Sequence, residues 1–134
     1  MDGYAKCALN VHPLPRGRVW PVDRFYARDN APITITEWAR KRRDFHYCLL
    51  GQWEGGTGEY VRTYWVGVDV NFGDDGATTI FEAHIRVETD RHFYRYCTEV
   101  EARTGHDNAL WYVKRGIKPW DDTAVHAVGG TPSK

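Results

Sequence analysis

Apolar residues follow strand-like and helix-like patterns along the chain, and these patterns divide it into a helix, a run of strands and a second helix. Three segments rich in Val, Tyr, Trp and Phe predict strands over residues 46–53, 60–72 and 78–88, and a shorter fourth strand is expected over 92–97. The connections between them are too short for crossover helices. We therefore predict an antiparallel meander.

Two capping-box patterns mark where helices begin. In each, a threonine is followed three residues later by a glutamate: Thr34 with Glu37, and Thr98 with Glu101. The two side chains of such a box bond to each other's backbone N–H groups. We predict a short helix after Thr34, and a long helix after Thr98 that runs to about Arg115.

Small residues on one side of the long helix favour close packing on the sheet. Gly105 lies in the middle of this side, and a glycine inside a helix costs about 1 kcal/mol relative to alanine. Its neighbours at helical spacing are Ala102, Ala109, Leu110 and Val113. The sheet residues expected beneath the helix are Val66, Val68, Phe81 and Ile85.

These elements predict an α+β fold. It has a four- or five-stranded antiparallel sheet, the long helix packed on one face, a short N-terminal helix and a small hairpin. The length of 134 residues fits a single domain. We predict an arm over residues 1–24, the domain over 25–116 and a loose tail over 117–134.

Composition excludes several classes of protein. The chain has 18 basic and 18 acidic residues, and this balance argues against a generic duplex nucleic-acid or anionic-membrane ligand. No apolar run reaches the roughly 20 residues of a membrane span, and no secretory signal is expected at the N-terminus. The widely spaced Cys7, Cys48 and Cys97 suggest reduced thiols.

One face of the predicted sheet gathers side chains that could carry chemistry. Alternation along the strands places Asp69 and Glu82 near each other, with Arg95 or Arg86 between them. The whole group is Thr63, Trp65, Asp69, Glu82, His84, Arg86 and Arg95. It could form an acid/base pair, a small metal site or a ligand face. The more common arrangement of such residues is a structural ion network.

The sequence contains none of the short motifs that mark well-known types of catalytic site. The only serine is Ser133, and no nucleophile motif, phosphate-binding loop or metal-ligand spacing occurs. The glycines of residues 55–58 join two strands, and His106 is expected to be a packed helix histidine. We predict no catalytic residue, no metal and no cofactor, which favours a non-enzymatic protein.

One dense basic run, Arg40, Lys41, Arg42 and Arg43, ends the first predicted helix. It could contact phosphate or an acidic protein surface. It could equally be a solvated helix end whose charges complement the helix dipole. Both interpretations stay open at this stage.

Several short motifs follow one another in a distinctive order. They are YWVGVD at 64–69, FG at 72–73, IFE at 80–82, YRY at 94–96 and T-x-x-E-A-x-x-G-H at 98–106. This order resembles a family of small uncharacterised proteins encoded in phages and prophages. The family core is similar to W-L-G-L-D-H-x-F-G, F-E-T-M-V-F and R-Y-x-T-x-E-E-A-x-x-G-H. The chain departs from it at Val70 and at Ala83-His84.

The resemblance covers about residues 25–110 and implies a viral context without an established activity. We expect a phage accessory protein that acts by binding in the host cytoplasm, where it blocks or redirects a host protein such as a defence nuclease. Tyr, Trp and Arg, which dominate interface hot spots, support this hypothesis. The alternative is a small-ligand or nucleotide-binding protein, or a hydrolase, that uses the polar sheet face. A virion part and a homodimer stay open.

Overall fold

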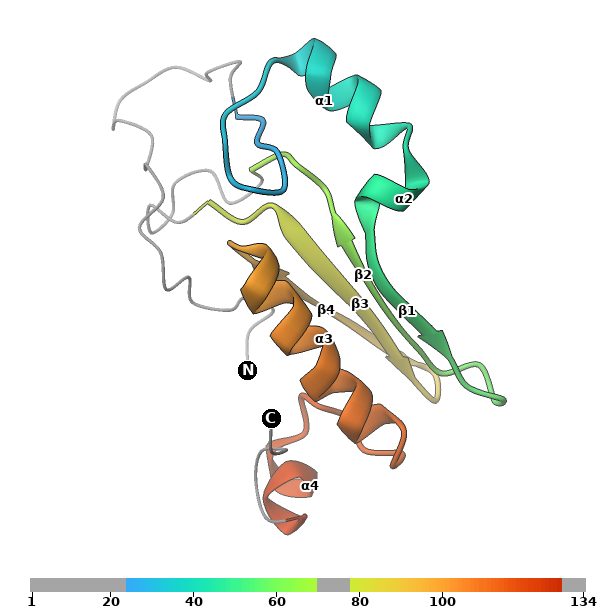
Figure 1. Cartoon of the computed structure of the whole chain (residues 1–134). Helices are drawn as coiled ribbons and strands as arrows, with labels where there is room; N and C mark the ends of the chain where they lie inside the picture. Colours follow the sequence, from blue (N-terminus) through green and yellow to red (C-terminus); the bar gives the residue numbers. More distant parts are fainter. Residues whose placement is uncertain (1–23, 70–77, 129–134) are drawn as a thin grey trace.

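A single antiparallel sheet organises the protein. The computed structural model describes residues 24–69 and 78–128, and its four strands pair in chain order (Figure 1). The strands are β1 (Leu49–Glu54), β2 (Tyr60–Trp65), β3 (Phe81–Val87) and β4 (Asp90–Tyr96). The predicted α+β fold with an antiparallel meander is confirmed.

Helices precede and follow the sheet. They are α1 (Ile35–Arg42), α2 (Phe45–Cys48), α3 (Glu99–Val113) and α4 (Asp122–Ala127). Both predicted capping boxes are present, at Thr34 for α1 and at Thr98 for α3. The sequence did not predict α2, which occupies the expected start of the first strand, or α4, which lies in the segment expected to be loose.

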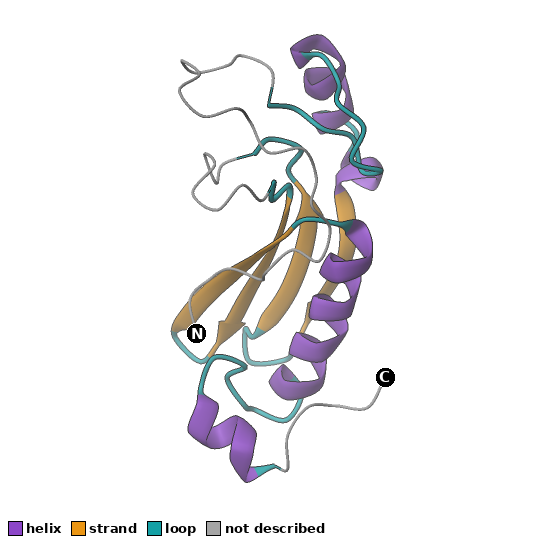
Figure 2. Cartoon of the chain, turned by 90° about the vertical axis from the view of Figure 1, so that its left-hand side faces the viewer, coloured by secondary structure: helices purple, strands orange, loops and turns teal. Residues whose placement is uncertain are grey.

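Helix α3 lies along one face of the sheet, which we call the inner face (Figure 2). The buried core forms between the two layers. Ala102 of α3 packs in one cluster with Trp65 and Phe81, and Ala109 packs in a second cluster with Ile85. Phe81 and Ile85 therefore lie beneath the helix as predicted.

The register of β2 on β3 decides which side chains share a face. Val61 pairs with Ile85, Thr63 with Ala83, and Trp65 with Phe81. The odd-numbered residues of both strands therefore face α3. The expectation that Val66 and Val68 lie beneath the helix is wrong, because it paired even positions of one strand with odd positions of the other.

Residues just before α1 close over the end of the sheet. Phe25 bridges to Val68, and Tyr26 bridges to Pro32 in the small hairpin that the sequence predicted. Arg24 forms a buried ion pair with Asp69, with 2.5 Å between Nη2 and Oδ2. This segment thus joins two parts of the chain that lie far apart in sequence.

The two cysteines that the structure describes differ in oxidation state. Cys48 is buried and free, and it lies against the C-terminal end of α1, where its Sγ is 3.5 Å from the Lys41 carbonyl oxygen. Cys97 is also buried but is disulfide-bonded. The expectation of reduced thiols is therefore wrong for Cys97, because the odd number and wide spacing of the cysteines did not indicate the bond.

Candidate binding face

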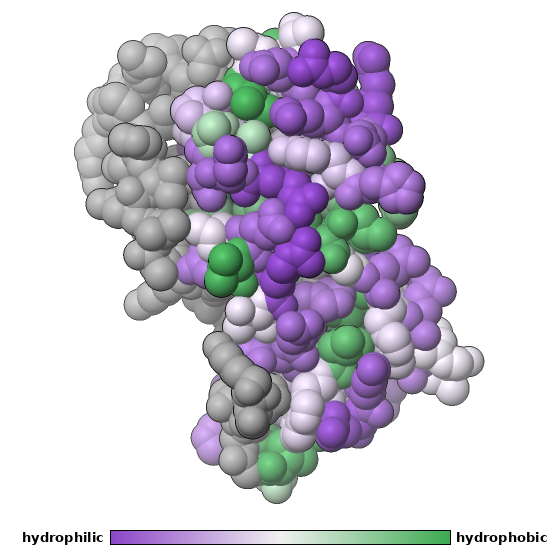
Figure 3. Space-filling view, in the orientation of Figure 1, coloured by the Kyte–Doolittle hydropathy of each residue, from purple (hydrophilic) through white to green (hydrophobic). Residues whose placement is uncertain are grey.

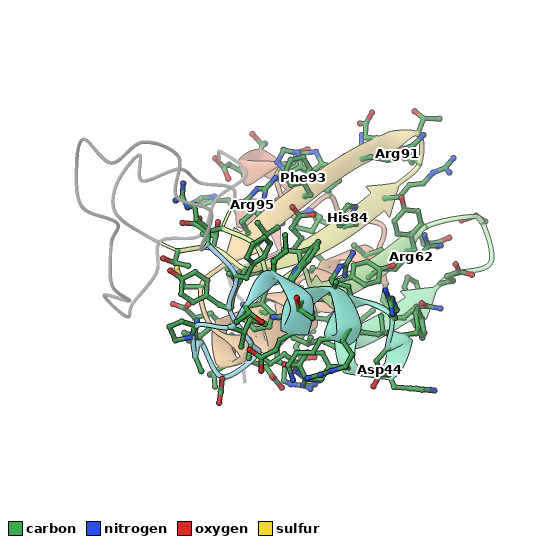
Figure 4. The ribbon with its side chains drawn as sticks, turned by 90° about the horizontal axis from the view of Figure 1, so that it is seen from above. Asp44, Arg62, His84, Arg91, Phe93 and Arg95 are labelled. Carbon is green, nitrogen blue, oxygen red and sulfur yellow. The ribbon has the colours of Figure 1, made fainter. Side chains whose placement is uncertain are left out.

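The side of the sheet opposite α3, which we call the outer face, carries rings and charges. Its members on the three strands β2, β3 and β4 are Tyr60, Arg62, Tyr64, Glu82, His84, Arg86, Arg91, Phe93 and Arg95. Several of them are labelled in Figure 4. Helix α3 packs on the inner face, and no described helix packs on this one.

Aromatic rings cross the middle of the outer face. His84 lies between its two neighbours, with ring centroids 5.9 Å from Tyr64 and 6.0 Å from Phe93. The contact with Tyr64 is edge-on, and the contact with Phe93 is stacked. Phe93 is 45% exposed, and the side chain of His84 is 47% exposed. Two ring surfaces are therefore open to solvent.

Two arginines of the outer face are held against these rings. The Arg95 guanidinium lies 5.1 Å from the Phe93 ring centroid and pairs with Glu82 at 2.7 Å. Arg62 lies 4.0 Å from the ring centroid of Tyr60 and pairs with Glu54 of β1. Such contacts restrict the two side chains before any ligand arrives.

A second pair of arginines has no such partners. Arg86 and Arg91 lie directly opposite each other on β3 and β4. Arg86 donates to the Glu88 carbonyl oxygen at 3.0 Å, but within the described ranges neither arginine has a carboxylate partner. Like charges opposed across strands repel each other. This end of the outer face therefore favours an anion.

Glu82 is already engaged by its neighbours. Its carboxylate lies 2.9 Å from Nε2 of His84 and 2.7 Å from Nη1 of Arg95. The hydrogen bond with His84 lowers the pKa of Glu82, and the charges of Arg95 and Arg42 act in the same direction. Glu82 therefore stays ionised and holds two side chains of the face in place.

The predicted polar group divides between the two sides of the sheet. Glu82, His84, Arg86 and Arg95 come together on the outer face. Thr63, Trp65 and Asp69 do not join them: the first two face α3, and all three are buried.

Each of the displaced residues has a structural partner. Thr63 lies 2.7 Å from Nδ1 of His106, and the Trp65 indole N–H donates to the Tyr26 carbonyl oxygen at 2.9 Å. Asp69 pairs with Arg24 rather than lying beside Glu82. His106 is thus the packed helix histidine that the sequence predicted.

Sequence reasoning missed five residues of the outer face: Tyr60, Arg62, Tyr64, Arg91 and Phe93. Alternation along each strand was visible, since Arg62 and Tyr64 alternate with buried residues. The missing information was the register that joins this pattern to β3. With the correct register, the same alternation would have placed these residues with His84.

The basic run at the end of α1 points in several directions. Lys41 lies 4.6 Å from the Tyr47 ring centroid, and Arg42 donates to the Trp65 carbonyl oxygen at 3.1 Å. Arg40 and Arg43, both exposed, border a surface groove of about 400 Å³ that also includes Ile35. The run is therefore not one continuous basic patch.

Another surface cleft, of about 670 Å³, lies between Tyr47 and the start of α3. Its arginine, Arg28, donates to both carboxylate oxygens of Glu99 at 2.8 and 2.6 Å. Arg103 adds a third bond to the same carboxylate. The charges of Arg28 and Glu99 at this cleft thus satisfy each other, unlike those of Arg86 and Arg91.

The side of the molecule over α3 offers less for a ligand. Figure 3 shows it as mainly hydrophilic, with separate apolar patches. Among residues 24–69 and 78–128 no group of three or more His, Cys, Asp or Glu side chains is placed to hold a metal ion. In the same part of the chain, no helix is long and apolar enough to cross a membrane.

Comparison with known proteins does not indicate a function, so the chemistry of the outer face is the basis for proposing one. No protein-family model, curated protein or solved structure matches the chain significantly.

Proposed function

We propose that the protein acts by binding, and that its outer face takes a nucleotide-type ligand, one that joins an anionic phosphate to an aromatic base. The observation that carries this proposal is the opposed pair Arg86 and Arg91 beside the exposed ring of Phe93. Arginine forks match phosphate oxygens in geometry and charge. An exposed ring offers a stacking surface for a base.

The state of Glu82 supports binding rather than catalysis. A general base works best when its pKa lies near the operating pH. The pKa of Glu82 is lowered by its hydrogen bond with His84, so this carboxylate holds protons weakly at neutral pH. Its hydrogen bond with His84 and its ion pair with Arg95 instead position those two side chains on the face.

Titration of the labelled protein with adenosine monophosphate, followed by NMR, tests this function. We expect amide and side-chain shifts at Arg86, Arg91 and Phe93, and weaker binding in the Arg91→Ala variant. The Arg115→Ala variant is the matched control, because it removes the same charge from an exposed position just beyond the end of α3. Shifts confined to α3, or none at all, would contradict the proposal.

A second candidate function follows from the phage resemblance, and a separate surface supports it. Ile35 of α1 and Phe45 of α2 are 60% and 57% exposed, and Arg40 and Arg43 lie close by in the chain. Exposed apolar residues with arginines beside them are typical of protein contact sites. We propose that a host protein in the host cytoplasm, such as a defence nuclease, docks here.

Affinity capture from host lysate tests this second candidate. Wild-type protein should retain one dominant partner, and a double variant with Ile35→Glu and Phe45→Glu should lose it. A Val100→Glu variant is the control, since Val100 is 75% exposed on α3. Equal capture by all three proteins would exclude the α1–α2 surface as the docking site.

A further inference from the structure

We propose that the ligand of the outer face is single-stranded nucleic acid rather than a free nucleotide. This inference rests on the proposed function, because it uses the same rings and the same arginines. It specifies in addition that the ligand is longer than one nucleotide and is single-stranded. Three features of the face carry it.

The first feature is that arginines lie at both ends of the row of rings: Arg86 and Arg91 have no carboxylate partner within the described ranges, whereas Arg95 is paired with Glu82. Arg91 and Arg95 lie on the same strand four residues apart, with Phe93 between them. At about 3.3 Å per residue, their backbone positions are roughly 13 Å apart. A stacked strand of nucleic acid advances only about 3.4 Å per phosphate. The rings therefore extend over more than one nucleotide, with a phosphate at Arg86 and Arg91 and successive bases over the rings beyond them.

The second feature is the kind of side chain on the face. On β2, β3 and β4 the outer face holds tyrosine, histidine, phenylalanine, arginine and one glutamate, and no aliphatic residue. Arginine and aromatic residues also occur in protein–protein interfaces, but the buried centre of such an interface is more apolar than this face. Bases and phosphates, by contrast, need rings and cations in alternation. The composition of the face therefore favours nucleic acid over a protein partner.

The third feature concerns strandedness. In a duplex the bases are stacked on one another, so their faces cannot lie on Phe93 or His84. The net charge of zero leaves no excess of positive charge for general duplex attraction. An unpaired strand can present its bases to both exposed rings and its phosphates to Arg86 and Arg91.

Fluorescence anisotropy with a labelled twelve-nucleotide oligothymidylate, at two salt concentrations, tests the inference. The competitors are a duplex of the same length and thymidine monophosphate. We expect the single strand to bind at least about 10-fold more tightly than either competitor, because only it can place several bases on the rings while a phosphate binds at Arg86 and Arg91. Its affinity should also fall as the salt concentration rises.

Single substitutions assign the binding to the outer face. Phe93→Ala should weaken oligonucleotide binding by roughly 5- to 100-fold, the usual loss for one stacking ring. Arg91→Ala should reduce the slope of log affinity against log salt by about 0.7, the value for one phosphate contact to a single strand. Val100→Ala and Arg115→Ala are the controls. Thermal unfolding confirms that each variant is folded.

The outcomes separate this inference from the function on which it rests. If adenosine monophosphate shifts the outer face but the oligonucleotide binds no more tightly than the mononucleotide, the inference fails and the proposed function stands. Equal binding of duplex and single strand, or equal loss in Arg115→Ala and Arg91→Ala, also overturns it. Binding of a host protein that Phe93→Ala abolishes, without oligonucleotide binding, would assign the face to a protein.

Discussion

Gly105 shows how far a single position can constrain the packing of two elements. A Cβ atom built there would lie 2.1 Å from the Tyr96 hydroxyl oxygen and 2.3 Å from its Cζ. The glycine that weakens α3 locally therefore allows the helix to approach the sheet. Burial of the Tyr96 side chain raises its pKa to about 12.

Replacing Gly105 by alanine should therefore destabilise the protein, although alanine favours helices. We expect a loss of about 1–3 kcal/mol in the free energy of unfolding, as for other overpacked cores. Urea unfolding measures it. Gly56→Ala is the control, because nothing lies within 4 Å of a Cβ at that position. A Gly105→Ala variant as stable as wild type would show that the Tyr96 ring moves aside freely.

His106 should make stability depend on pH. Burial lowers its pKa below the usual 6.5, so the folded protein binds this proton less readily than the unfolded chain. Its contribution is complete above pH 6.5 and is lost as the pH falls toward the folded-state pKa. Thermal unfolding from pH 7.5 to 5.5 should show a smaller decrease for His106→Gln than for wild type. Identical decreases would mean that other groups cause the acid sensitivity.

At the scale of elements, local signals predicted the helices but not the faces of the sheet. The capping boxes at Thr34 and Thr98 act within four residues, so the sequence alone locates them. The face of a strand depends on its partner, and a slip of one residue exchanges the two faces. The sequence pattern extended the second strand to residue 72, whereas β2 ends at Trp65. The turn position inferred from that longer strand gave the wrong register. It placed Trp65 and Asp69 on the same face as Glu82.

The two capping boxes should differ in their effect on stability. Helix α3 buries residues in both core clusters, whereas no residue of α1 is buried. Thr98→Ala should lower the free energy of unfolding by about 1 kcal/mol. Thr34→Ala should change global unfolding less and should speed amide exchange in α1 alone. Equal global losses would show that α1 unfolds together with the core.

At the scale of the whole molecule, the two faces of the sheet carry different kinds of side chain. The inner face and the residues that close its end hold the core, and the outer face keeps exposed rings and cations. The sequence predicted that Arg95 or Arg86 lies beside Glu82, and the structure pairs Glu82 with Arg95, which lies opposite it on the neighbouring strand. Arg24 could not be predicted as the partner of Asp69, because that contact depends on the complete fold.

The Arg24–Asp69 pair should contribute strongly to the stability of the whole protein. Both side chains are buried, so removing one partner leaves the other charge in the interior. Asp69→Ala should lower the free energy of unfolding by about 3–5 kcal/mol. Glu54→Ala, which breaks the more exposed pair with Arg62, should cost no more than about 1 kcal/mol. Similar small losses in both would show that the segment around Arg24 does not anchor the fold.

The closure of residues 24–26 over the end of the sheet also bears on the order of folding. The hairpins of the meander join neighbouring segments, and their formation closes shorter loops than does the contact of Arg24 with Asp69, 45 positions away. We therefore expect the meander and α3 to form the folding nucleus. The contact of Arg24 with Asp69 then forms after the rate-limiting barrier. A substitution that weakens the Arg24–Asp69 ion pair would then leave the refolding rate nearly unchanged and accelerate unfolding. We therefore expect substitutions in the segment before α1 to change the lifetime of the folded state more than the rate at which it forms.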